Sequence, residues 1–183
     1  MTESRMVFYG FKPYENGSMA QMTTTGEVEI PVNVYAEPGT DMLMPRGTLC
    51  EFALQGIANE RSIKVFSRKE DYLRSDIRIA CPGMIPVGVF ATEEEEREGS
   101  FCEVPTVVFS GVVKSVEVLD PMPYRPAFFA EIQTLDLTIN LYYDYDKAVR
   151  PGDLFFCEAW LFGDITRKND GRTSGNGGTA KNT

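Results

Sequence analysis

Apolar and polar residues alternate along much of residues 104–165, and this two-residue period constrains the fold more than any other feature. Side chains of a β-strand point alternately to its two faces, so such a run predicts a strand with one buried face. The clearest run spans 128–143, and its apolar members are Ile132, Leu135, Leu137, Ile139 and Leu141. Residues 107–119 and 154–162 predict two further strands. Gly111 lies within the first of these, where a bulge or sharp bend is expected.

The first half of the chain predicts more strands and one short helix. Residues 28–34 alternate in the same way, but Pro31 has no N–H to donate, so this strand is expected at an edge or with a bulge. Residues 67–74 predict a helix of about two turns, with Ser67 as the N-cap and Glu70 at the capping-box position. The fold class is therefore mainly β: a small antiparallel barrel, or two packed β units, with one short helix near 67–74.

Composition shifts divide the chain into four parts. Residues 1–90 form an N-terminal β-rich region, and residues 104–166 form the second β unit. Between them, 91–103 is acidic and is interpreted as a solvated linker or one exposed helical turn, with an acidic docking site as the alternative. Residues 167–183 contain almost no apolar side chain and are expected to be disordered.

The chain of 183 residues contains no histidine, which narrows its possible chemistry. Nucleophiles activated by histidine and metal sites with a histidine ligand are excluded. The four cysteines are far apart in sequence and are interpreted as reduced thiols rather than as a zinc site or disulfides. We therefore predict no catalytic residues, no cofactor and no metal.

Charge and hydropathy bear on partners and location. The formal net charge of −9 disfavours nucleic acid, although a local basic groove could still bind it. No apolar run reaches the length of about 20 residues that a membrane helix needs, and the N-terminus lacks the features of a signal peptide. These observations predict a cytoplasmic protein that does not bind membranes.

Residues 104–165 resemble an OB-fold barrel at the level of the superfold. The similarity lies in a long strand with a mid-strand glycine, a loop, a second strand, a loop with an Arg-Pro-Gly-Asp turn at 150–153 and a last strand that ends in Trp-Leu-Phe-Gly. The resemblance implies a bent first strand shared between two sheets. It also implies a ligand class, namely single-stranded nucleic acid or oligosaccharide.

Two loops of this unit, at 120–126 and 143–150, form its candidate functional rim. Carboxylates and aromatic rings next to a turn could hold a Ca²⁺ ion or a sugar hydroxyl, whereas turn chemistry alone favours a polar hairpin tip. The candidate ligand-binding residues are Tyr124, Arg125, Tyr142, Tyr143, Asp144, Tyr145 and Asp146.

The many aromatic residues of 104–165 have two interpretations. On one face they would form a stacking platform for bases, but such platforms need basic side chains, and this region has nine acidic residues against four basic ones. The interpretation as core is therefore favoured.

Three functions remain at this stage. The first is a non-enzymatic β-barrel module that binds a protein partner or assembles with itself. The second is an OB-like binder of single strands or oligosaccharides. The third is a carboxylate- or metal-dependent hydrolase that uses Asp144, Asp146 or Asp153.

Overall fold

The computed structural model describes residues 1–37 and 43–165. Eleven strands belong to one continuous hydrogen-bonded sheet. They are β1 (Ser4–Tyr14), β2 (Gly17–Thr24), β3 (Pro31–Ala36), β4 (Leu49–Phe52), β5 (Gln55–Ala58), β6 (Lys64–Phe66), β7 (Gly83–Val87), β8 (Thr106–Val118), β9 (Phe128–Thr134), β10 (Leu137–Tyr143) and β11 (Leu154–Gly163). Two short helices, α1 (Lys69–Arg74) and α2 (Glu93–Glu98), and a 3-10 turn at Glu60–Ser62 complete the described elements. The prediction of a mainly β protein is confirmed.

Five of the strands close into a barrel. β8, β9 and β10 pair antiparallel in succession, β10 pairs with β5, β5 pairs with β11, and β11 returns to β8. The pairing of β5 with β10 is parallel, so the predicted small barrel is present but is not wholly antiparallel. The interior is filled by apolar residues that alternate along these strands, including Ile132, Ile139, Leu141, Phe155 and Leu161.

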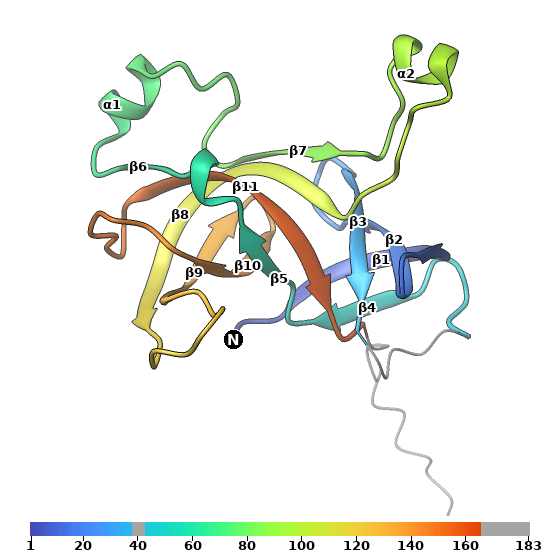
Figure 1. The fold of residues 1–183 in the computed structure, drawn as a ribbon, viewed down its shortest axis with the longest axis horizontal. Helices are drawn as coiled ribbons and strands as arrows, with labels where there is room; N and C mark the ends of the chain where they lie inside the picture. Colours follow the sequence, from blue (N-terminus) through green and yellow to red (C-terminus); the bar gives the residue numbers. More distant parts are fainter. Residues whose placement is uncertain (38–42, 166–183) are drawn as a thin grey trace, which may run out of the picture.

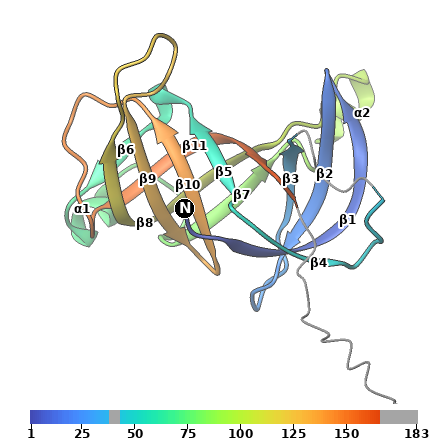
Figure 2. The same ribbon diagram turned by 90° about the horizontal axis from the view of Figure 1, so that it is seen from below.

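The remaining N-terminal strands form a curved sheet beside the barrel (Figures 1 and 2). Its order is β4, β1, β2, β3, and all three pairings are antiparallel. β3 joins it to the barrel by a short parallel pairing in which Tyr35 and Ala36 lie opposite Phe162 and Gly163 of β11. Pro31 is the first residue of β3, which places the residue without an N–H at the start of a strand whose far end is paired on both sides.

β8 changes its partner along one edge, and Gly111 marks the change. Residues 106–110 of β8 pair with β7, and residues 112–118 pair with β9. A Cβ atom at Gly111 would clash with the backbone carbonyl of Gln133 and would lie 2.8 Å from Cγ2 of Ile132. Only glycine therefore allows β9 to start pairing directly after β7 ends. The register irregularity between β8 and β9 lies further along, between Val113 and Ser115, and not at Gly111, where a bulge or bend is expected from the sequence.

Hydrogen bonds from Thr134, the last residue of β9, connect the three strands at this point. Its hydroxyl donates to the carbonyl oxygen of Ser110 at 2.7 Å and to that of Gly83 at 3.3 Å. Thr134 and Ser110 are both fully buried, so these bonds satisfy polar groups that would otherwise be costly to bury.

Both helices lie on loops that project from the sheet (Figure 1). α1 falls in the predicted range 67–74, but it begins at Lys69 after an N-cap, Arg68, whose side chain makes no capping bond. The expected Ser67 capping box is thus wrong, and the turn depends on packing of Tyr72 instead. α2 lies in the acidic segment 91–103 and has a complete capping box between Thr92 and Glu95. Neither of these helices is long and apolar enough to cross a membrane.

Strands from before the acidic segment 91–103 pair with strands from after it. β5, β6 and β7 come from residues before it, yet they pair with β10, β11 and β8. The closed barrel is therefore built from both sides of this segment, while the division of the chain at 91–103 stays a prediction. The predicted disordered tail at 167–183 lies outside the described residues.

We expect Gly111→Ala to destabilise the protein by about 2–3 kcal/mol, because the new methyl group must displace β9 backbone from β8. Gly10→Ala in β1 is the matched control, since its Cβ would have its nearest neighbour at 4.0 Å. Urea unfolding of both variants measures the difference. Equal stability of the two variants would contradict the role assigned to Gly111.

Candidate functional site

The two predicted rim loops lie side by side at one end of the barrel. The N–H of Ala127 donates to Oδ1 of Asp144 at 2.7 Å, which connects the end of the first loop to the start of the second. Asp144, Tyr145 and Asp146 line a shallow cavity together with Glu60 and Phe128. The structure thus brings together the Asp144–Asp146 part of the predicted rim.

Tyr124 and Arg125 occupy the outer tip of the first loop. Tyr124 is fully exposed and has a left-handed backbone conformation with φ of 61°. Arg125 lines a separate cavity, formed by residues 118–123 and 125–127, that does not include Tyr124. These two predicted residues therefore do not share a cavity with the Asp144–Asp146 group.

Tyr143 belongs to the core. Its side chain is 1% exposed and packs between the rings of Phe128 and Phe155, with centroids at 5.5 and 5.4 Å. Its hydroxyl has no hydrogen-bond partner among the described residues. Burial raises the pKa of Tyr143 to about 12, which fits a phenol held away from water.

The carboxylates suggested for metal chemistry have local structural roles. Asp144 accepts the Ala127 N–H described above, and Asp153, which is buried, accepts the N–H of Arg150 at 2.9 Å. Within residues 1–37 and 43–165, no three side chains of Cys, Asp or Glu gather to hold a metal ion. Burial also raises the pKa values of the Cys81 and Cys157 thiols, which makes both poor nucleophiles.

A second feature is a continuous aromatic array on the outside of the barrel. It crosses five strands, and each ring contacts the next at a centroid distance between 5.1 and 6.4 Å. In spatial order the array consists of Tyr14, Tyr35, Trp160, Phe162, Tyr142 and Phe129. All six side chains are half-buried, because they lie on the outward positions of strands whose inward neighbours fill the core.

β5 supplies the groups in the middle of the array. Gln55 lies opposite Phe162 and accepts a hydrogen bond from the Tyr142 hydroxyl at 3.4 Å, while its amide donates to Glu37 at 3.3 Å. Ile57 lies opposite Tyr142 and is 44% exposed. The array therefore combines rings, an amide, a carboxylate and one exposed aliphatic side chain on a single surface.

The N-terminal residues cover part of the outer face of β10, and the array ends where they begin. The side chain of Asn140 exchanges hydrogen bonds with the backbone of Thr2, and Ser4 bonds to the backbone of Thr138. Residues 2–4 thus cover the outer face of β10 beyond Tyr142, and the uncovered part is the part that carries the rings.

The aromatic residues of 104–165 divide between the core and the outer surface. Tyr143 and Phe155 fill the core, whereas Phe129, Tyr142, Trp160 and Phe162 are on the outside. Tyr145 packs against the core from the barrel end. Sequence reasoning missed Tyr14, Tyr35 and Ile57 as members of this surface. The alternation in 31–36 predicted that Tyr35 and the buried Val34 lie on different faces of the strand. Nothing in the sequence showed that β3 would pair with β11.

Comparison with known proteins finds no matching family model, no matching curated protein and no matching solved structure. The surfaces described above are therefore the basis for assigning a function.

We expect Tyr143→Phe to leave the free energy of unfolding unchanged or to raise it by up to about 1 kcal/mol, because the lost hydroxyl has no partner. Tyr72→Phe is the control, since its hydroxyl donates to the Ile79 carbonyl at 2.8 Å, and we expect it to cost about 1 kcal/mol. Chemical unfolding of both variants tests this. A clear loss of stability in Tyr143→Phe would show that its hydroxyl has a stabilising partner.

The raised pKa of Tyr143 also predicts a pH dependence. Between about pH 10 and 12 an unfolded tyrosine loses its proton while the buried one keeps it. The folded state then binds more protons, so the free energy of unfolding falls as the pH rises through this window. Unfolding measured at about pH 9 and about pH 11 should show a smaller fall for Tyr143→Phe than for the natural chain. The same fall in both proteins would show that the pH dependence does not come from the raised pKa of Tyr143.

Proposed function

We propose that the chain is a non-catalytic β-barrel module that binds or assembles through its aromatic array. The observation that carries this proposal is the unbroken contact of six half-buried rings around the exposed Ile57. Tyrosine and tryptophan are the residues that contribute most to protein interfaces, since they bury large apolar areas with little loss of conformational freedom. A protein surface, including that of a second copy, is the partner that this composition fits best.

The strand arrangement supports an OB-like class for the barrel. β8 is the bent strand with a central glycine, β9 and β10 follow it, and β11 closes the barrel against it. The fifth strand, β5, precedes the others in the chain, which is a departure from the order that the resemblance implies. OB barrels bind extended ligands on the face of their second and third strands, which correspond here to β9 and β10 with Phe129 and Tyr142.

A second candidate ligand is an oligosaccharide. Gln55 and Glu37 lie among the rings, and an amide and a carboxylate beside aromatic rings can bind sugar hydroxyls. Single-stranded nucleic acid is less well supported, because stacking platforms for bases work together with basic side chains. The cation–π contact found in the described part joins Arg46 to Tyr9, which is outside the array.

The hydrolase alternative gains no support from its carboxylates, because Asp144 and Asp153 are each engaged by a backbone N–H. A cytoplasmic location remains part of the proposal and follows from the sequence alone.

Two measurements test the proposed function. Light scattering after size exclusion reports assembly with a second copy, and Trp160, the one tryptophan of the chain, reports ligand binding by its fluorescence. We expect either a concentration-dependent mass or a change in fluorescence with an uncharged gluco-oligosaccharide, and a weaker change or none with an oligothymidylate at the same salt concentration.

Ile57→Asp should abolish whichever response is seen, because it places a charge in the centre of the array. Leu73→Asp is the control, since Leu73 is more exposed than Ile57 and lies on α1, away from the array. A strict monomer at high concentration together with an unchanged Trp160 spectrum in every titration would overturn the proposal. Equal effects of Ile57→Asp and Leu73→Asp would show that the response does not depend on the array.

A further inference from the structure

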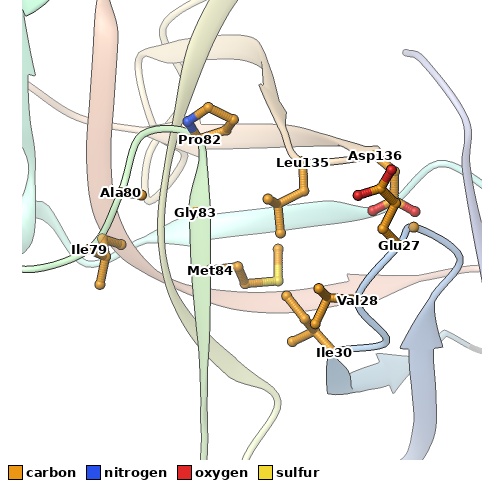
Figure 3. Close-up of a pocket in the computed structure, with 11 residues that line it drawn as sticks. Glu27, Val28, Ile30, Ile79, Ala80, Pro82, Gly83, Met84, Leu135 and Asp136 are labelled. Carbon is orange, nitrogen blue, oxygen red and sulfur yellow. The ribbon is translucent and has the colours of Figure 1, made fainter.

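A cavity of about 710 Å³ lies away from the array, where four chain segments meet (Figure 3). The loop between β2 and β3, the segment that leads into β7, the start of β7 and the turn between β9 and β10 all contribute to it. Most of its lining is apolar and comes from Val28, Ile30, Ile79, Pro82, Met84 and Leu135. Its volume falls within the range of about 300–1,000 Å³ that is typical of small-ligand pockets.

The apolar side chains converge on the cavity from both parts of the fold. Figure 3 shows Leu135 and Met84 pointing toward Val28 and Ile30 from the opposite side. Val28 is 71% exposed and Leu135 is 38% exposed, so these two side chains do not fill a core, whereas Met84 is 8% exposed and belongs to the edge of the core. An apolar ligand that entered the cavity would remove the surfaces of Val28 and Leu135 from water, which is the main source of affinity in such pockets.

Leu135 occupies a backbone position that does not suit it. It is the first residue of the two-residue turn between β9 and β10 and has a φ of 50°. The left-handed region costs a leucine roughly 1 kcal/mol, and glycine or asparagine is the usual residue there. Leucine at this position therefore makes the turn less stable than glycine or asparagine would.

The lining of the cavity contains two carboxylates, those of Glu27 and Asp136, and Figure 3 shows both to the right of Leu135. Asp136 is held in place because its Oδ2 accepts hydrogen bonds from the N–H and the hydroxyl of Thr25, both at 3.0 Å. Glu27 has no hydrogen bond or ion pair with the described residues, and the lining contains no lysine or arginine.

We propose that this cavity binds an organic cation with an apolar body, with the body among Met84, Leu135 and Val28 and the charge beside Glu27 and Asp136. A cation beside Glu27 and Asp136 gains favourable charge contacts, and the lining holds no basic side chain that would oppose it. The net charge of −9 also raises the local concentration of cations around the whole chain. The same chemistry could be offered by a free alkylamine or by a peptide in which leucine stands next to lysine.

The methyl group of Met84 gives a direct readout in the full-length chain. Labelling with ¹³C-methyl methionine reports all eight methionines at once, and Met84→Leu identifies the signal from the cavity. The probes are hexylamine, hexanol and hexanoate, which share one apolar body and differ in charge. A capped peptide that contains Leu-Lys, with a Leu-Gln peptide as its neutral partner, forms the second arm.

We expect hexylamine or the Leu-Lys peptide to shift the Met84 signal with an affinity about two- to fivefold higher than that of its neutral partner, as an exposed charge contact allows. Hexanoate should bind most weakly. Glu27→Gln should remove most of the preference for the cation, whereas Glu29→Gln, which changes an exposed neighbour outside the lining, should leave it intact.

Leu135→Asn separates binding from folding. The substitution should raise the melting temperature, because asparagine tolerates the left-handed position, and it should weaken all probes that bind. Which arm responds distinguishes a free amine from a peptide as the source of the ligand. The proposal is wrong if no probe shifts the Met84 signal at concentrations up to about 10 mM. Equal binding of the charged and neutral probes would also overturn it.

Discussion

The close approach of two backbones at Gly111 is the constraint on which the barrel depends. On one edge of β8 this residue marks where pairing passes from β7 to β9, and on the other edge it lies opposite Phe155 of β11. The absence of a side chain at this residue therefore lets β9 pack against β8. Because β9, β10 and β11 carry four of the six rings in the array, the position of the outer surface follows from the same contact.

The two candidate surfaces both depend on how the N-terminal sheet meets the barrel. The short pairing of β3 with β11 brings Tyr35 against Trp160 at 5.1 Å and so extends the array beyond the barrel. The loop between β2 and β3 then reaches the turn between β9 and β10, where Thr25 binds Asp136 and one wall of the cavity forms. Without residues 1–36 the array would lose Tyr14 and Tyr35, and the cavity would lose the wall formed by Gly26, Glu27, Val28 and Ile30.

The sequence predicted a chain rich in strands because a two-residue period reports directly on burial. Residues 137–143 show this clearly, since Leu137, Ile139, Leu141 and Tyr143 are all buried. The single run predicted at 128–143 is nevertheless two strands, β9 and β10, separated by a turn at Leu135 and Asp136. The same period put Tyr143 in the core, although the predicted rim had treated it as a ligand-binding residue together with Tyr142. Pairing could not be predicted in this way, because hydrogen bonds between distant strands leave no local pattern. The array and the cavity both arise from such pairings, which is why neither was found from the sequence.

The position of β5 has a consequence for how the chain reaches this structure. Asn140 of β10 bonds to Leu54, 86 residues earlier in the chain, and β5 must also pair with β11, which is the last strand. A growing chain therefore makes the fifth barrel strand long before either of its neighbours exists. Closure must wait for the C-terminal strand and must pay the loop-closure entropy of a distant contact, which places the protein among slowly folding β topologies. Until then β5 and β8 each have an edge that lacks its β11 partner, and unfinished chains are exposed to edge-to-edge association with one another.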